Sequence, residues 1–379
     1  MRVGITTSVI QRGHTGVAQY VFALVRALIE RGTHEYTLFV LEEDLGLFEF
    51  ASGKVEIVKI EERYRPPCKD ILWHQFVLPG LARILRLDLL HVPSYRRMIW
   101  SAPCPVMATI HDLAVFSVRE KYDWKRMFYG RVVAARLARR QSRILAISEN
   151  TAQDIVRFFR IPRDRLDVVH SGLDHKRFFP GDAARAKLLC AEKFGLDRPF
   201  FLYVSRLEHP AKNHVRLVEA FDRFKATTGS PWLLAFAGED WHDAIAIHQA
   251  IQSSPNCRDI RCTGFVNDAL LPDLYRAAEV FVYPSLYEGF GMPPLEAMAC
   301  GCPVICSARG ALGEVVGNAA AVVEPEDVNA LASQLCAVSM SPAVREQMRK
   351  AGLAQAKRFD WSESAAGTLE VYERAAMRH

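Results

Sequence analysis

The sequence alternates short apolar runs with amphipathic stretches along its whole length. Runs such as 200–204 (FFLYV) and 280–283 (VFVY) are uniformly hydrophobic, as expected of parallel strands buried on both faces. Because parallel strands are joined by helical crossovers, the alternation predicts an α/β chain with helices on both faces of parallel sheets. The predicted strands are 2–7, 36–41, 55–60, 88–92, 105–110, 143–147, 166–170, 200–204, 232–237, 259–262, 279–283 and 303–306. The predicted helices include 15–31, 122–141, 149–159, 342–357 and 361–377.

The pattern restarts near residue 200, after a stretch at 170–182 whose glycines and proline are typical of an interdomain linker. A chain of 379 residues, half of them apolar, can form two hydrophobic cores. We therefore predict two Rossmann-like domains, 1–175 and 176–360, with parallel sheets facing each other across a cleft. Ligands of such sheets bind beyond the carboxyl ends of the strands, so polar residues just after strands are the candidates for function.

The composition of the chain limits the class of protein to which it can belong. The N-terminal MRVGITTSVIQRG resembles a first strand rather than a signal peptide, and no uncharged apolar stretch of about eighteen residues occurs. We therefore expect a cytoplasmic protein. The nine cysteines are scattered without C-x-x-C pairs, so we expect reduced thiols and no metal site. Basic residues outnumber acidic ones in 1–180 and the reverse holds in 181–379, which suggests that one domain faces an anionic partner.

The strongest motif is EGFGMPPLEAMACGCPV at 288–304, directly after a predicted strand. Gly289 and Gly291 permit a tight loop with exposed amides, and the two prolines after Met292 suit a first helical turn. A helix N-terminus presented in this way binds phosphate, while Glu288 and Glu296 can meet the hydroxyls of a sugar and a ribose. The alternative is a capped helix with two acids facing solvent, which the Gly-Phe-Gly-Met-Pro-Pro context around Phe290 disfavours.

A second motif, SRLEHPAKN at 205–213, follows the strand 200–204. Arg206 and Lys212 could stabilise a diphosphate whose charge grows as a glycosidic bond breaks. The alternative for this pair is two ordinary surface cations.

Two weaker signals lie in the first half. In RGHTG at 12–16, Gly13 and Gly16 would let a ligand approach the backbone, although the motif is shorter than a G-x-G-x-x-G fingerprint. His111-Asp112 ends the strand 105–110, where the imidazole could donate a hydrogen bond to a sugar or leaving oxygen. A lone histidine in such a place is more often structural.

Taken together, these motifs resemble the retaining glycosyltransferase family 4, with the GT-B fold, over nearly the whole chain. Glu288 to Glu296 resembles the E-x7-E motif of the family, which implies that Glu288 contacts the donor sugar and Glu296 the ribose. By the same resemblance, Arg206 and Lys212 would bind the donor diphosphate, and Gly16 would belong to the glycine-rich loop. His111 would contact the donor sugar, and the backbone of Gly264–Val266 would contact the base. It further implies that the first domain, 1–175, binds the acceptor and is completed by the helix 361–379, and that the second domain, 176–360, binds the nucleotide-sugar.

One departure from the family pattern is the spacing of the two cations. Many members place the lysine five residues after the arginine, whereas Lys212 follows Arg206 by six. The additional residue lies within 208–211 and could shift the loop.

The resemblance implies a retaining hexosyltransferase that needs no metal or other cofactor, and the sequence contains no Asp-x-Asp pair. The expected catalytic residues are His111, Glu288, Arg206 and Lys212. The donor is expected to bind at Gly16, Arg206, Lys212, Val266, Glu288, Gly289, Phe290, Gly291, Met292 and Glu296. Similarity to bacterial polysaccharide mannosyltransferases favours transfer of mannose from GDP-mannose to a glycan or polyprenyl-linked glycan in cell-surface polysaccharide synthesis, including lipopolysaccharide. UDP-glucose or a deoxysugar nucleotide remains an alternative donor.

The stretch 121–143 is the richest in basic residues. On a helical wheel of about 100° per residue, an arc of about 100° holds Lys121, Lys125, Arg136, Arg139, Arg140 and Arg143. Trp124, Phe128 and Val132 lie along one flank, which fits a helix on the anionic inner face of the cell membrane. The alternative is the solvated face of a packed helix.

Other functions fit the sequence less well. A nicotinamide dehydrogenase would carry the G-x-G-x-x-G fingerprint, and a two-lobed sugar-binding protein is usually exported. A sugar phosphorylase or nucleotide-sugar epimerase shares the expected fold. Nucleic-acid binding is not expected, because the basic stretch lies in no known binding module.

Overall fold

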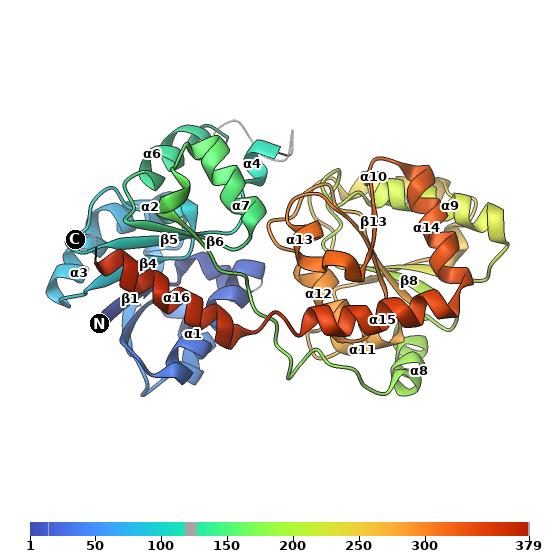
Figure 1. Cartoon of the computed structure of the whole chain (residues 1–379), viewed down its shortest axis with the longest axis horizontal. Coiled ribbons are helices and arrows are strands. Elements are labelled where there is room, and N and C mark those ends of the chain that lie inside the picture. Colours follow the sequence, from blue (N-terminus) through green and yellow to red (C-terminus); the bar gives the residue numbers. More distant parts are fainter. Residues whose placement is uncertain (14, 118–126, 378–379) are drawn as a thin grey trace. The chain divides into compact units, whose positions relative to one another are not determined.

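A computed structural model describes residues 1–13, 15–117 and 127–377. The chain divides into two compact units, 1–172 together with 359–379, and 173–358. Figure 1 shows helices on both faces of the sheet in each unit. No helix within these ranges is long and apolar enough to cross a membrane.

The first unit contains a seven-stranded sheet in the order β3-β2-β1-β4-β5-β6-β7, and all of its pairs are parallel. Its strands are β1 (Arg2–Thr6), β2 (Glu35–Leu41), β3 (Glu56–Ile60), β4 (Leu89–Val92), β5 (Val106–Ile110), β6 (Arg143–Ala146) and β7 (Leu166–Val168). Its helices are α1 (Gly16–Arg31), α2 (Pro67–Leu72), α3 (Leu78–Ile84), α4 (Ala114–Ser117), α6 (Ala135–Ala138), α7 (Glu149–Asp154) and α16 (Trp361–Ala376). Wider π-helical turns lie at Trp73–Val77, Tyr129–Ala134 and Ile155–Phe159.

The second unit contains a parallel six-stranded sheet in the order β10-β9-β8-β11-β12-β13. Its strands are β8 (Phe200–Val204), β9 (Leu233–Ala237), β10 (Ile260–Gly264), β11 (Val280–Tyr283), β12 (Val304–Ser307) and β13 (Ala321–Val323). Its helices are α8 (Ala183–Phe194), α9 (His214–Thr228), α10 (Ala244–Ser253), α11 (Leu271–Ala277), α12 (Met292–Ala299), α13 (Leu312–Val316), α14 (Val328–Met340) and α15 (Pro342–Ala356). The two sheets confirm the predicted α/β class with two Rossmann-like units.

Local chemistry explains the well-predicted elements. Helix α1 begins after Thr15, whose hydroxyl accepts from the Ala18 amide, and ends at Gly32 in the left-handed region. The central strands are apolar on both faces because helices cover both sides. The edge strand β13 was not predicted, since it has three residues and only one of them is buried.

Helix α16 packs on the first unit. The Tyr372 hydroxyl lies 2.8 Å from Nδ1 of the buried His91 on β4, and His91 Nε2 lies 2.8 Å from the Thr109 hydroxyl on β5. Arg31 of α1 donates to the Ser362 carbonyl. These contacts hold the C-terminal helix against the sheet of the unit in which the chain begins.

The predicted basic helical face over 121–143 is wrong at its C-terminal end. The helical turns end at Ala138, and Arg143 is the first residue of β6. The Arg143 guanidinium is buried and lies 2.6 Å from the Asp167 carboxylate, so it cannot face a membrane. Lys121, Trp124 and Lys125 lie outside the described residues.

Candidate functional site

The two strongest sequence motifs meet at the carboxyl edge of the second sheet. The strand order places β8 beside β11, and the chain runs outward in opposite directions from this pair. Such a switch point is where open parallel sheets bind ligands, because the loops after the two strands diverge there. Residues 205–213 follow β8 and residues 284–291 follow β11, so both motifs leave the sheet at this point.

Lys212 and Glu288 form a partly enclosed ion pair at this edge. Lys212 Nζ lies 2.6 Å from Glu288 Oε1, and the two side chains are 15% and 17% exposed. Burial lowers the pKa of Lys212, but Glu288, Tyr203 and Glu208 together raise it by more, so the resulting pKa is raised. The ammonium therefore stays charged at neutral pH.

Two further donors point at the same carboxylate oxygen. The Tyr283 hydroxyl at the end of β11 donates to Glu288 Oε1 at 2.9 Å, and the Ser285 hydroxyl donates at 2.7 Å. Lys212 Nζ also lies 3.4 Å from the Tyr283 oxygen. Three donors, from the end of β11 and from the loops after β8 and β11, thus fix the position of one carboxylate oxygen.

The backbone of Glu288 is held by a loop that only glycine fits. A Cβ on Gly310 would lie 2.1 Å from the Glu288 carbonyl oxygen, and Gly310 has a φ of +64°. The next amide, of Ala311, donates to that carbonyl at 2.9 Å. The loop after β12 therefore packs directly against the motif that follows β11.

Beyond Glu288, the chain turns through Gly289 and Phe290 into helix α12. Gly291 precedes the helix with a φ of +112°, and prolines occupy its second and third positions after Met292. Prolines there sacrifice no helical hydrogen bond, as the sequence predicted. The result is a helix N-terminus at the switch point.

Glu296 lies one turn into α12 and accepts a hydrogen bond of 2.8 Å from the Tyr275 hydroxyl. Burial raises the pKa of Glu296 to about 7, against the lowering effects of Tyr275 and the more distant Arg177. The carboxyl group is therefore partly protonated at neutral pH. An ionised carboxylate there could accept two hydroxyl hydrogen bonds, as a ribose diol offers.

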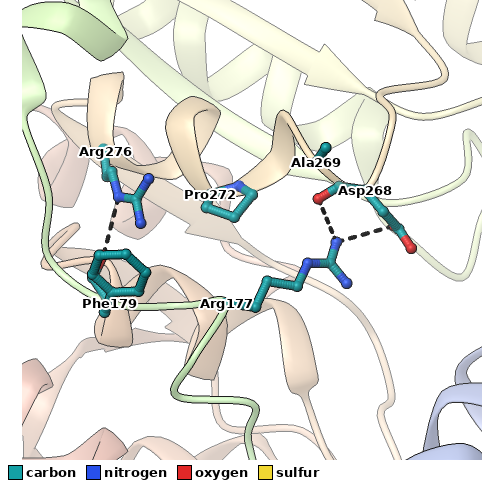
Figure 2. Close-up of a pocket in the computed structure, with 6 residues that line it drawn as sticks. All are labelled: Arg177, Phe179, Asp268, Ala269, Pro272 and Arg276. Carbon is teal, nitrogen blue, oxygen red and sulfur yellow. Dashed lines mark hydrogen bonds and ion pairs between the residues drawn. The ribbon is translucent and has the colours of Figure 1, made fainter. Parts of the chain in front are cut away.

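A cavity of about 440 Å³ lies beside α11, the helix that carries Tyr275, and is lined by Arg177, Phe179, Asp268, Ala269, Pro272 and Arg276. Figure 2 shows the Arg177 guanidinium directed at Asp268, with 3.1 Å to the carboxylate and 2.7 Å to the backbone carbonyl. Asp268 follows Val266 by two residues, so the segment predicted to meet the base leads into the rim of this cavity.

Arg206, the other predicted cation of this loop, contacts the ring of Trp241. Its side chain is exposed, and its guanidinium carbon lies 4.5 Å from the centre of the Trp241 ring. The additional residue of this loop is accommodated by backbone pairing with the segment after β9, since the Leu207 and His209 amides donate to the Glu239 and His242 carbonyls. In this structure Arg206 contacts Trp241 and Lys212 contacts Glu288, and the role of the two cations toward a diphosphate stays a prediction.

In the first unit, the predicted Gly16 is the first residue of α1, after the loop that follows β1, and His111 directly follows β5. Gly16 is exposed, and a Cβ there would meet no atom within 4 Å, so chain packing does not require a glycine. His111 Nε2 donates to the Pro93 carbonyl at 3.2 Å, and the Tyr20 ring lies edge-on at 4.7 Å. Burial lowers the pKa of His111 to about 4, so the imidazole is neutral at pH 7 and its Nδ1 is an acceptor.

Sequence reasoning missed three side chains of the site: Tyr275, Tyr283 and Ser285. Tyr283 ends a predicted strand and Ser285 lies between that strand and Glu288, so their positions could have suggested a role. Nothing local marked Tyr275, because it reaches Glu296 from a neighbouring helix.

Comparison with known proteins shows the family to which the chain belongs. The profile of Glycosyl transferases group 1 matches residues 188–355, and that of Glycosyltransferase Family 4 matches residues 14–177. The O-antigen chain mannosyltransferase B of Escherichia coli is 30% identical over 98% of this chain and 100% of its own length. The chain belongs to glycosyltransferase family 4. This membership makes it a glycosyltransferase and sets aside the dehydrogenase and sugar-binding alternatives.

Other proteins match part of the chain, and solved structures of lower identity share its fold. The serotype-specific mannosyltransferase WbdA of Escherichia coli is 28% identical over 79% of this chain, which spans 37% of that protein. The sucrose-phosphate synthase of Thermosynechococcus elongatus has a TM-score of 0.80 at 21% identity, with both chains fully covered. WaaG, described as a glycosyltransferase of lipopolysaccharide biosynthesis, has a TM-score of 0.73 at 14% identity over 98% of this chain and 99% of its own. Both structures show the GT-B fold.

Proposed function

We propose that this family 4 glycosyltransferase retains the configuration of a hexose that it moves from a nucleotide-sugar to a glycan acceptor. The observation that supports the proposal most is the arrangement at the β8–β11 switch point. There Glu288 and Glu296 flank a glycine loop and a helix N-terminus, and Lys212 contacts Glu288 at 2.6 Å. A sugar, a diphosphate and a ribose match these groups in that order.

The departing diphosphate gains negative charge, which Lys212 and the amides at the start of α12 would stabilise. Arg206 would join them by leaving the Trp241 ring, since its exposed side chain is free to rotate. Among the described residues, no group of three His, Cys, Asp or Glu side chains is placed to hold a metal ion. Our proposal assigns charge stabilisation to these cations and amides.

In the proposed complex, His111 accepts a hydrogen bond from a hydroxyl of the donor sugar. Its Nε2–H is already bound to the Pro93 carbonyl, which leaves Nδ1 as the group available to a ligand. Of the two partners that the sequence suggested, a sugar hydroxyl and a leaving oxygen, an acceptor of this kind favours the sugar hydroxyl.

Mannose from GDP-mannose is the proposed donor. Support comes from the names of the O-antigen, WbdA and MMP α-(1→4) mannosyltransferases, which this chain resembles at 28–30% identity. Asp268 adds a chemical reason, because guanine presents two adjacent N–H donors that suit a carboxylate. Uracil presents one donor between two acceptors, which a carboxylate would repel.

The proposed acceptor is a glycan or polyprenyl-linked glycan of a cell-surface polysaccharide. This proposal rests on the O-antigen function named for the relative that matches the whole chain. It leads us to expect that the protein works at the inner face of the cell membrane.

A thermal-shift panel of nucleoside diphosphates and their sugars, with EDTA present, tests the donor. GDP and GDP-mannose should stabilise the wild type and not Glu296→Ala. Selective stabilisation by UDP-glucose or a deoxysugar nucleotide would replace mannose, and no stabilisation by any nucleotide would overturn the proposed site. The anomeric configuration of the product, measured by NMR, tests retention.

A further inference from the structure

The first unit carries a row of exposed apolar side chains on one face of a long helical ridge. Helices α2 and α3, labelled in Figure 1, continue through the π-helical turn at Trp73–Val77. Exposed residues recur along this ridge every three or four positions. The apolar ones are Leu72 at 53%, Phe76 at 77% and Ile84 at 76% exposure.

Trp100 extends this row across to the next loop. The Gln75 side chain, adjacent to Phe76, donates to the Met98 carbonyl at 2.9 Å and accepts from the Trp100 amide at 3.0 Å. Trp100 is itself 53% exposed. Large side chains that are exposed singly are normal, but a cluster spanning a helix and a neighbouring loop marks an interaction surface.

Three exposed cations accompany this cluster. Lys69 and Arg83 are exposed on the same ridge, and the Arg140 guanidinium lies 3.6 Å from the centre of the Trp100 ring. None of these three cations forms an ion pair with an acid in the part of the chain that the structure describes. Of the nearest acids to Lys69 and Arg83 in the sequence, Asp70 is buried against Arg97, and the exposed Asp88 accepts from the Arg2 amide.

We propose that this face, formed by Lys69, Leu72, Phe76, Arg83, Ile84, Trp100 and Arg140, docks on an anionic phospholipid surface. Phe76, Ile84 and Leu72 would enter the boundary between headgroups and acyl chains. Trp100 suits the interface because its ring is apolar and its N–H is polar. The three cations would meet lipid phosphates.

This lipid-docking face deepens the proposal of a lipid-linked acceptor and rests on it. It also differs from the sequence hypothesis, which placed the contact on one helical face over 121–143. Of that face, Arg140 remains part of the new surface, whereas Arg143 is buried.

Co-sedimentation of the full chain with vesicles tests the proposal. Vesicles containing phosphatidylglycerol should bind the protein at 50 mM salt, and vesicles of phosphatidylcholine alone should bind it at least tenfold less. Binding should also fall at least tenfold at 500 mM salt, because exposed charges are screened.

Matched variants separate the face from general surface properties. Phe76→Ser with Ile84→Ser should lower vesicle binding about tenfold or more, since each large side chain would lose its apolar burial. Leu188→Ser with Ile245→Ser removes equally exposed residues from the second unit, at 74% and 69%, and should change nothing. Lys69→Gln with Arg83→Gln should weaken binding, whereas Arg185→Gln with Lys193→Gln, exposed on α8, should not.

Three outcomes would overturn the lipid-docking face. The first is a wild type that does not bind anionic vesicles at low salt. The second is a loss of vesicle binding in the control variants equal to that in the variants of the face. The third is a dimer that Phe76→Ser dissociates, without any vesicle binding. GDP stabilisation, measured on the same variants, distinguishes the two proposals. It should persist in every variant of the face, whereas its absence from the wild type would count against the donor site and not against this surface.

Discussion

Glu296→Gln should make the protein more stable at pH 8 and leave its stability almost unchanged near pH 4.5. Burial raises the pKa of the folded carboxyl to about 7 from an ordinary value of 4.5. Below pH 4.5 the group is protonated whether the chain is folded or unfolded, so it contributes no penalty. As pH rises to about 7, the unfolded chain loses this proton more readily than the folded one, and the free energy of unfolding falls.

The size of this effect follows from the two pKa values. A tenfold change in proton affinity corresponds to about 1.4 kcal/mol, so the full difference is about 3 kcal/mol. Because the side chain is only partly buried, we expect a gain of about 1–3 kcal/mol for Glu296→Gln at pH 8. Glutamine resembles the protonated acid in shape and can keep the hydrogen bond from Tyr275.

Urea unfolding of wild type and Glu296→Gln at several pH values between 4.5 and 8 measures the difference. Tyr275→Phe is the companion variant, because losing its hydrogen bond should raise the pKa of Glu296 further and move the loss of stability to higher pH. A Glu296→Gln gain that is equal at all pH values would refute the assigned pKa.

Nucleotide binding gives a second measurement on the same residue. If the ionised carboxylate accepts ribose hydroxyls, GDP should bind the wild type more tightly as pH rises through about 7. Glu296→Gln should bind GDP about 10–100-fold more weakly, without that pH dependence. Equal GDP affinity in both proteins would remove Glu296 from the nucleotide site.

Three further predictions concern the same edge of the sheet. Lys212→Met should lower the free energy of unfolding by about 2 kcal/mol, because it leaves the partly enclosed Glu288 carboxylate without its cation. The same variant should reduce kcat/KM about 1000-fold. Adding Glu288→Gln to it should restore stability but not turnover. Arg206→Ala should reduce kcat about 100-fold with no change in melting temperature, and undiminished turnover would exclude its role with the leaving group. Gly310→Ala should destabilise the protein and lower kcat. Gly195 has the same φ of +64° but open space around it, so Gly195→Ala should lower the free energy of unfolding by only about 1 kcal/mol. Equal effects of the two variants would mean that the contact of Gly310 with Glu288 is unimportant.

The elements and the candidate motifs could be predicted from the sequence because their causes are local. Uniformly apolar runs predicted the strands β8 and β11, which lack polar faces because both sides are covered. Gly291 and the prolines that follow it predicted the start of α12, since they restrict the backbone whatever surrounds it.

The contacts within the site could not be predicted from local pattern. Lys212 and Glu288 are 76 residues apart and meet because β8 and β11 are neighbours at the switch point. Local sequence does not determine strand order, which follows from how all the strands pack together. For the same reason the Tyr275 bond to Glu296 was missed, as was the Arg206 contact with Trp241.

Arg143 shows most clearly what could not be predicted from the sequence alone. Its place in a basic stretch suggested a membrane-facing cation, yet the sheet buries it against Asp167, which lies on the neighbouring strand β7. The sequence by itself determined which residues form strands, helices and glycine loops, because those preferences act within a few residues. Only the tertiary structure decided which charges pair and which remain exposed, because burial and distance depend on segments far apart in the chain.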